Sequence, residues 1–303
     1  MNVALIGYGE VGKILAEDLR VAGHSVAAHD RVATASMRAH ACIHGVTLAA
    51  SPGDAVRRAD LVVSAVTASE TMAAAASCAD SLPVGTFFLD LNSASPGSKV
   101  AAARRINGSK KRGRYVEGTV MTAVPPYRIK VPLLLGGPDA TALQPLLTEL
   151  GFVARVASAK LGVASATKMC RSVIIKGLEA MVLESFTAAR HYGVEDAVIA
   201  SLRETFPGVD WEKQAAYFFQ RAIEHGRRRG EEMREAALTV REASLEPWSA
   251  AGTAERQTWL AALAEQGVFG QPGSETFARS PDWRTEADRI LDTLRAGRTA
   301  GDE

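Results

Sequence analysis

The chain opens with MNVALIGYGEVGKILAEDLRVAGHSVAAHD, residues 1–30. The apolar run at residues 3–6 predicts a buried strand, and the amphipathic pattern at about residues 10–22 predicts a helix. A glycine-rich loop, GYGEVG, joins the two, and a second strand is expected at residues 25–29. This order of strand, glycine-rich loop, helix and strand is typical of a unit that binds a dinucleotide.

The loop fits the pattern Gly-x-Gly-x-x-Gly, in which each glycine has a physical role. Gly7 permits a tight turn, Gly9 lets the backbone approach a pyrophosphate, and Gly12 lets the helix pack closely on the strand. The N–H groups and the positive dipole end of the helix N-terminus favour the same pyrophosphate. The residues expected to bind the cofactor here are Gly7, Tyr8, Gly9, Glu10, Val11 and Gly12.

An acidic residue, Asp30, ends the second predicted strand. A carboxylate at this position would accept hydrogen bonds from the adenosine ribose hydroxyls and would repel a 2′-phosphate. The sequence therefore predicts that NAD is preferred over NADP. The adjacent Arg31 leaves NADP possible, because an arginine there can bind a 2′-phosphate.

Composition limits the class of protein. The chain has 303 residues, of which 47% are hydrophobic and 23% charged, and this suits two folded domains. A net charge of +1 argues against nucleic acid or an anionic membrane as the main partner. The three cysteines, Cys42, Cys78 and Cys170, are far apart and odd in number, so they indicate neither a disulfide framework nor a metal site. Because no apolar run reaches the roughly 18 residues of a membrane span, and no leader is expected before the first strand, we expect a cytoplasmic protein.

The chain changes character near residue 157. Strand and helix patterns alternate before it, which predicts a Rossmann-like, doubly wound parallel sheet. The further strands are expected near residues 46–48, 61–66, 86–91, 115–119, 131–135 and 152–156. Only helices are expected afterwards, beginning with one long helical pattern from about 160 to 192. We therefore predict a dinucleotide-binding domain at 1–157 and an all-α domain at 158–303 that serves substrate binding and dimerisation. Turns are expected at Pro207-Gly208 and Pro272-Gly273, and fraying at residues 301–303.

The long helical pattern carries three polar residues on one face. Lys168, Ser172 and Lys176 recur at a spacing of four residues, so they share that face. The face could be a site, or it could simply be solvated. The buried side is expected to consist of Met169, Val173, Ile174, Leu178 and Met181.

Four stretches resemble the β-hydroxyacid dehydrogenase superfamily, which includes 3-hydroxyisobutyrate and 6-phosphogluconate dehydrogenases. GYGEVG matches its cofactor loop, and DLNSASP (90–96) is similar to its D-x-S-T-x-x-P turn. EGTVMTA (117–123) aligns with its D-A-P-V-S-G-G substrate loop. Gly162, Lys168 and Ser172 align with its G-x(5)-K-x-x-x-N, in which the lysine is catalytic. The runs at 168–172, 176–180 and 225–234 resemble an uncharacterised branch that has its own helical domain.

The resemblance implies an NAD(P)-dependent oxidoreductase that transfers hydride between the nicotinamide and a hydroxy-acid-like alcohol or carbonyl substrate. Lys168 would donate and accept the proton, and Ser172 would assist at the same oxygen, although a serine in a helix often bonds its own backbone instead. The cofactor would lie across the carboxyl ends of the strands, with Val66, Thr67 and Asn92 beside it. The small-molecule substrate would sit in the cleft between the domains. Its expected contacts are Ser93, Thr119, Met121, Thr122, Lys176, His225 and Arg228.

Several positions depart from the family pattern or have a second interpretation. The Ser-Gly-Gly of the substrate loop is here Met121-Thr122-Ala123, which should narrow the pocket and exclude the simplest hydroxy acids. Asn92 and Ser93 could serve only the turn, and Ser95 is expected to be an N-cap. The basic run His225–Arg229 could be a solvated helix face or an anion site.

Two alternatives to a hydroxyacid dehydrogenase remain open at this point. One is an imine reductase-like activity, and the other is a catalytically silent, dinucleotide-binding regulatory protein. We also expect a homodimer, because the apolar stripe of the long helix needs a partner surface.

Overall fold

The computed structural model describes residues 1–271, 274, 277, 280 and 282–299. Pro272-Gly273 and residues 301–303 lie outside this part of the chain. The chain divides into two compact units, Met1–Cys170 and Arg171–Glu303, which we call the N-terminal unit and the helical unit. The division falls inside the long helix α7 (Val163–Tyr192), after the last strand has ended. The first turns of α7 belong to the N-terminal unit because they are hydrogen-bonded to its sheet.

An eight-stranded sheet forms the N-terminal unit, in the order β3-β2-β1-β4-β5-β6-β7-β8. The strands from β3 to β6 pair in parallel, and their order is that of the Rossmann fold, so the predicted doubly wound sheet is confirmed. The strands are β1 (Asn2–Ile6), β2 (Ser25–His29), β3 (Thr47–Leu48), β4 (Leu61–Ser64), β5 (Phe87–Asp90), β6 (Arg114–Val120), β7 (Pro132–Gly136) and β8 (Val153–Ser158).

Strand β7 departs from the predicted parallel order, because it runs antiparallel to β6. The connection between them, residues 121–131, contains only the short 3-10 helix η2 (Arg128–Lys130). A parallel connection needs a crossover of roughly a dozen residues or more, usually an α-helix. Helix α6 (Ala140–Glu149) supplies such a crossover, and β8 is therefore parallel to β7.

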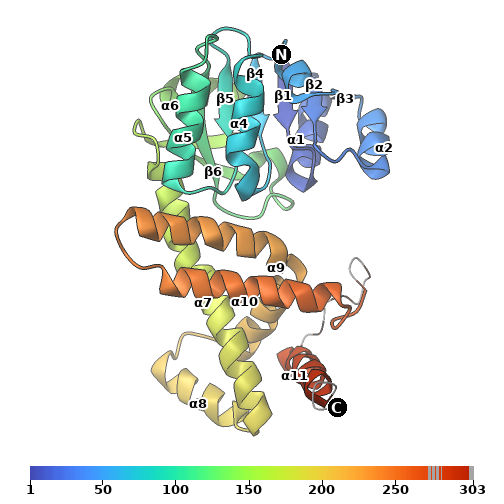
Figure 1. Ribbon diagram of the computed structural model, residues 1–303, viewed down its shortest axis with the longest axis vertical. Helices are drawn as coiled ribbons and strands as arrows, with labels where there is room; N and C mark the ends of the chain where they lie inside the picture. The colour runs from blue at the N-terminus through green and yellow to red at the C-terminus, as the bar shows by residue number, and fades with distance from the viewer. Residues whose placement is uncertain (272–273, 275–276, 278–279, 281, 300–303) are drawn as a thin grey trace. The chain divides into compact units, whose positions relative to one another are not determined.

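Two apolar cores cover the two faces of the sheet. Along β1, Val3 and Leu5 face one core, whereas Ala4 and Ile6 face the other, because side chains alternate along a strand. The first core contains side chains of α1 (Glu10–Val21), α2 (Ala35–Ile43) and α6. The second contains side chains of α3 (Pro52–Val56), α4 (Thr71–Ala79) and α5 (Pro96–Asn107), and Figure 1 shows α4 and α5 side by side. The 3-10 helix η1 (Ala68–Glu70) leads into α4.

Helices alone form the described part of the helical unit, as predicted. After α7 come α8 (Glu195–Thr205), α9 (Trp211–Glu242), α10 (Trp248–Glu265) and α11 (Trp283–Thr299), with the expected Pro207-Gly208 turn between α8 and α9. Trp283 anchors the core, with its ring centroid 5.0 Å from that of Phe186 and 5.8 Å from that of Phe219. Within the described residues, no helix combines the length and the apolar composition of a membrane span.

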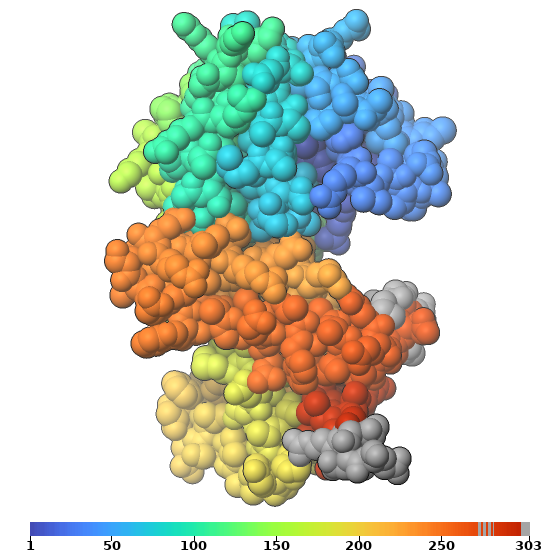
Figure 2. Space-filling model, viewed as in Figure 1, coloured from blue at the N-terminus to red at the C-terminus, as the bar shows by residue number. Residues whose placement is uncertain are grey.

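Helices α9 and α10 pack closely along their length (Figures 1 and 2). Two glycines of α9 allow this approach. A Cβ atom on Gly226 would lie 2.7 Å from the carbonyl oxygen of Gln257, and one on Gly230 would lie 2.6 Å from Thr258 Oγ1. The run HGRRRGEE therefore contains a helix-packing motif, which its composition alone did not predict.

The buried side of α7 in the helical unit differs from the expected one. Ile174 and Met181, which we expected to be buried, are 69% and 63% exposed. Lys176 and Glu179, on the opposite side of the helix, are buried instead. The reason lies in α9, which supplies an oppositely charged partner for each of these buried groups.

Candidate functional site

The glycine loop leads from β1 into α1 at the carboxyl edge of the sheet. Gly7 has φ +97°, and a Cβ atom there would lie 2.4 Å from the carbonyl oxygen of Ala65. A Cβ atom on Gly12 would lie 2.2 Å from the carbonyl oxygen of Gly7, so the first turn of α1 packs directly on the loop. Gly9 is the N-cap of α1 and its Cβ position faces open space. Having no side chain, Gly9 leaves the N–H groups of the first turn to a ligand, and this geometry fits a pyrophosphate.

The other residues of the glycine loop differ in burial and therefore in whether their side chains could contact a ligand. Glu10 is exposed, whereas Val11 is half-buried and packs on the first core. The side chain of Tyr8 is buried, and its hydroxyl is 2.9 Å from His40 Nδ1. Burial, assisted by the charge of Glu17, raises the pKa of Tyr8 to about 12. The Tyr8 side chain is thus part of the domain interior.

Asp30 follows β2 and holds the glycine loop. One carboxylate oxygen accepts the backbone N–H of Tyr8 at 2.8 Å, and the other accepts that of Val32 at 3.0 Å. The side chain is half-buried, and each oxygen has a further lone pair for a ribose hydroxyl. Its neighbour Arg31 is exposed and forms an ion pair with Glu70 at 3.0 Å.

Asn92 bridges the ends of β4 and β5. Its Oδ1 accepts the N–H of Val66 at 2.8 Å, and its Nδ2 donates to Ser64 Oγ at 3.0 Å. The side chain is buried, so it holds the loop after β4 in place. Thr67, the next residue of that loop, is exposed at the same edge of the sheet.

Ser93 meets the predicted catalytic lysine. Lys168 Nζ donates to Ser93 Oγ at 2.7 Å, and both residues belong to the N-terminal unit and are half-buried. Two residues later, Ser95 Oγ accepts the N–H of Ser98 at 3.2 Å, which confirms Ser95 as the N-cap of α5. The turn after β5 therefore orients the lysine and begins a helix at the same time.

A buried ionic network beneath this turn was not anticipated. Lys99 Nζ donates to Asp90 Oδ1 at 2.8 Å and to the Asp90 carbonyl at 3.0 Å, and the Tyr115 hydroxyl donates to Asp90 Oδ2 at 2.6 Å. Asp90 also accepts the N–H of Asn92 at 2.8 Å. Burial and the charge of Asp90 raise the pKa of Tyr115, which keeps its proton. The network fixes the turn that carries Asn92 and Ser93.

Glu117 fixes the helix that carries Lys168. Its Oε1 accepts the N–H groups of Gly162 and Ala164 at 2.9 and 3.1 Å, and its Oε2 accepts the Ser165 hydroxyl at 2.9 Å. Glu117 is completely buried in β6. The sequence did contain a signal, because Glu117 begins the stretch that aligns with the family's substrate loop, but no role was predicted for it.

Of the other residues in the predicted substrate loop, some lie in strand β6 and some follow it at the surface. Thr119 is buried in β6, where it pairs with Leu134. Met121 is half-buried just after the strand, and Thr122 is exposed. A surface hollow of about 500 Å³ is lined by Pro96, residues 160–163, Ala166, Thr167 and Cys170, but not by Lys168 or the glycine loop.

Ser172 and Lys176 belong to the helical unit and bond to each other. Lys176 Nζ donates to Ser172 Oγ at 3.2 Å and forms an ion pair with Glu232 at 2.7 Å. Burial lowers the pKa of Lys176, and the charge of Glu232 opposes this shift. Ser172 Oγ therefore accepts a hydrogen bond from Lys176, and its role beside Lys168 stays a prediction.

The arginines in the basic run of α9 differ in burial and in their partners. Arg227 is exposed and pairs with Glu265, whereas Arg229 is buried and pairs with Glu179. Burial lowers the pKa of Arg229. The two residues predicted as substrate contacts, His225 and Arg228, are half-buried and exposed respectively.

Comparisons with known proteins support this description of both units. Residues 2–120 match the NAD binding domain of 6-phosphogluconate dehydrogenase, and residues 189–260 match a domain of unknown function, DUF1932. A conserved hypothetical protein from Sinorhizobium meliloti 1021 is 35% identical, with 95% of this chain and 96% of that chain covered and a TM-score of 0.72.

Two further solved structures share the fold of the chain. Conserved protein MTH1747, of unknown function and described as structurally similar to 3-hydroxyacid dehydrogenases, is 27% identical, with 87% of this chain and 99% of that chain covered and a TM-score of 0.66. 3-Hydroxyisobutyrate dehydrogenase from Mycobacterium tuberculosis shares the fold at 16% identity, with 95% and 98% covered and a TM-score of 0.70. The chain therefore belongs to the same family as the Sinorhizobium meliloti protein, and it combines a dinucleotide-binding domain of the 6-phosphogluconate dehydrogenase type with a DUF1932 helical domain in a 3-hydroxyisobutyrate dehydrogenase-like fold.

Proposed function

We propose that the protein is an NAD(P)-dependent oxidoreductase that acts on a hydroxy-acid-like alcohol or its carbonyl counterpart, with Lys168 as the general acid and base. The contact between Lys168 Nζ and Ser93 Oγ carries this proposal. Ser93 follows β5, and the glycine loop follows β1. Both strands pair in parallel with β4, which lies between them, so β1 and β5 run in the same direction. The carboxyl ends of parallel strands share one edge, so the lysine and the cofactor loop lie at the edge where ligands bind in such sheets.

The dinucleotide would be held by the glycine loop and the loops after β2 and β4. The uncapped first turn of α1 would bind the pyrophosphate, and Asp30 would accept the adenosine ribose hydroxyls. Val66 and Thr67 would lie beside the nicotinamide half, with Asn92 keeping their loop in position. When bound, the cofactor donates or accepts the hydride.

Lys168 would move the proton that accompanies hydride transfer. In the reducing direction its ammonium group protonates the oxygen of the former carbonyl, and in the oxidising direction the neutral amine removes the hydroxyl proton. Ser93 accepts a hydrogen bond from Nζ and so limits the positions that the amine can take. Because Ser172 is bonded to Lys176, we assign the role of lysine partner to Ser93.

The same site supports NAD as the preferred cofactor. The Asp30 carboxylate is fixed by two backbone N–H groups, so it cannot easily turn away from a 2′-phosphate. Arg31, the residue that could favour NADP, is paired with Glu70. Electrostatic repulsion by Asp30 therefore outweighs the attraction of Arg31 in this proposal.

We also propose that the protein is a homodimer formed through α7. Ile174 and Met181 lie on one side of this helix and expose most of their apolar surface to solvent, and Ile175 exposes 40%. A contiguous exposed apolar patch typically marks a protein–protein interface, and we propose that these side chains form one. A second copy of the same helix would cover it.

Turnover measurements test the proposed activity. The purified protein should oxidise hydroxy acids with NAD⁺, or reduce the corresponding carbonyl compounds with NADH, in a panel that also contains cyclic imines. Imines belong in the panel because an imine reductase from Streptomyces aurantiacus shares the fold at 18% identity and a TM-score of 0.54. Turnover of imines alone would favour the reductase alternative, and tight cofactor binding without any turnover would favour the regulatory one.

A further inference from the structure

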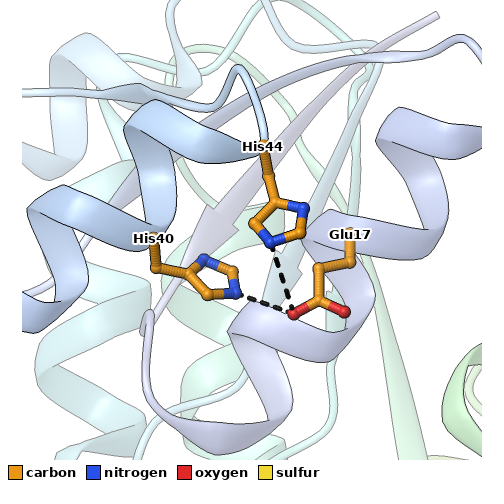
Figure 3. Close-up of side chains that lie close together, drawn as sticks. All are labelled: Glu17, His40 and His44. Atoms are coloured by element: carbon orange, nitrogen blue, oxygen red, sulfur yellow. Dashed lines mark hydrogen bonds and ion pairs between the residues drawn. The ribbon is translucent and has the colours of Figure 1, made fainter.

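Three potential metal ligands lie together between α1 and α2, outside the proposed active site. Glu17 comes from α1, His40 comes from α2, and His44 is the residue that follows the last turn of α2 (Figure 3). A spacing of four residues at the end of a helix places the two histidines about one turn from each other. Their ring centroids are 4.4 Å apart, and both rings point toward the same carboxylate (Figure 3).

The distances fit a tetrahedral metal ion. His40 Nε2 lies 2.7 Å from Glu17 Oε1, and His44 Nε2 lies 3.9 Å from the same oxygen. Ligand atoms at about 2.0–2.1 Å from a tetrahedral zinc ion are about 3.3 Å from each other. These two distances bracket this value, and all three ligand atoms lie within 4.8 Å of one another, so side-chain shifts of less than about 1.5 Å would bring each pair to the separation that zinc requires.

We propose that Glu17, His40 and His44 bind a divalent transition-metal ion of the zinc class. Two imidazoles and one carboxylate are a ligand set that zinc uses where one coordination position remains open to water. The three side chains are 25%, 18% and 33% exposed, which gives water access to that fourth position. The cysteines, which indicated no metal site, take no part in this cluster.

The side chains bonded to the proposed ligands are of the kind that orient the ligands in known metalloproteins. With a metal on His40 Nε2, the ring proton would sit on Nδ1 and donate to the Tyr8 hydroxyl, 2.9 Å away. Arg128 Nη2 binds the second carboxylate oxygen of Glu17 at 2.6 Å, which leaves Oε1 directed at the histidines. Arg128 is itself neutralised by Asp18 at 2.7 Å. Outer partners of this kind fix the tautomer and the orientation of the ligands.

The site is connected to the cofactor loop through Tyr8. This residue stands between Gly7 and Gly9, and its side chain reaches His40. A bound metal would therefore link α2 to α1 and restrict the side chain of Tyr8, a residue of the glycine loop. Glu17, His40 and His44 have no role in the proposed hydride or proton transfer, so the metal proposal does not depend on the oxidoreductase activity.

Calorimetric titration of tag-free, chelator-treated protein with Zn²⁺ tests the proposal. We expect one saturable equivalent, and a loss of affinity of more than about 100-fold in His40→Ala and in His44→Ala, since removing a ligand should cost more than removing an outer partner. Tyr8→Phe should lose about 10–100-fold. His191→Ala, which removes an exposed histidine of α7, is the matched control and should bind as the wild type does.

Cobalt provides a second measurement that does not depend on the stability of the variants. Wild-type protein with Co²⁺ should show the visible absorption of a four- or five-coordinate ion, and one equivalent of Zn²⁺ should abolish it. His44→Ala, checked for folding by circular dichroism, should lack this band. The proposal is overturned if the wild type has no saturable site, or if folded His40→Ala and His44→Ala bind zinc like the wild type.

Discussion

The Glu117 carboxylate accepts the backbone N–H of Gly162 at 2.9 Å and so joins strand β6 to the start of α7. The same side chain also binds Ala164 and Ser165. It thereby satisfies N–H groups that every helix leaves without a partner in its first turn. Lys168 lies in the next turn of this helix, so its position depends on a buried carboxylate in the sheet.

Replacing Glu117 should therefore destabilise the protein and misplace the lysine. Glu117→Ala would leave two buried N–H groups without an acceptor, at a cost of about 1–3 kcal/mol each. Glu117→Gln keeps an oxygen for both groups and should lose much less stability. Urea unfolding of the three proteins measures the difference. Equal stability of Glu117→Ala and the wild type would show that water replaces the carboxylate.

The sequence predicted most of the N-terminal unit, because its signals are local. Strand and helix patterns, the glycine loop and the Ser95 N-cap each depend on residues close together in the chain. The antiparallel direction of β7 was not predicted. The apolar pattern of a strand does not indicate its direction, and the absence of a helix pattern in the residues before β7 was the available signal.

The errors concern contacts between distant segments. Which side of α7 is buried depends on Arg229 and Glu232, which are 50 and 56 positions from the residues they pair with. The spacing of His40 and His44 is visible in the sequence, but Glu17 joins them only when α1 and α2 are folded against each other. The amphipathic pattern of one helix does not show which charged residues have a partner on another helix. A charged side chain with such a partner can be buried, as an apolar side chain can.

Lys168→Ala tests the proton-transfer role. The loops proposed to bind the cofactor do not include this residue, so cofactor affinity should remain nearly unchanged. Turnover should fall by about 10²–10⁴-fold, the usual contribution of a general acid or base. Lys168→Arg should fail almost as badly, because guanidinium does not lose its proton. Lys213→Ala, which removes an exposed lysine of α9, is the control. Near-normal turnover of folded Lys168→Ala would refute the mechanism.

Asp30 should determine the choice between NAD and NADP. Asp30→Ala removes the charge that opposes a 2′-phosphate, so the preference for NADH over NADPH should shrink or reverse. It also removes an acceptor from the N–H of Tyr8, and binding of NADH should weaken as well. Dissociation constants of both cofactors for wild type and variant measure both effects. Tighter binding of NADPH than of NADH by the wild type would contradict the assignment.

Acid should weaken the helical unit through Glu212. Hydrogen bonds from Arg284 hold the pKa of Glu212 below its usual value, and Trp283 adds a smaller effect of the same sign. A carboxyl group whose pKa is lower in the folded state stabilises the fold fully above its unfolded pKa, near 4.3, and loses this contribution as pH falls through the folded value. The urea midpoint should therefore decline less between about pH 5 and pH 3 in Glu212→Gln than in the wild type. Glu204→Gln, at an exposed position of α8, should follow the wild type.

The exposed side of α7 should control assembly. Ile174→Glu and Met181→Glu each place a charge on apolar surface that we propose a second copy covers, and burying an unpaired charge is strongly unfavourable. Light scattering at micromolar concentration should therefore give a dimer mass for the wild type and a monomer mass for both variants. Val21→Glu is the matched control, since Val21 is 88% exposed at the end of α1 and should leave the dimer intact. A monomeric wild type, or dimeric Ile174→Glu and Met181→Glu proteins, would mean that α7 is not the dimer interface.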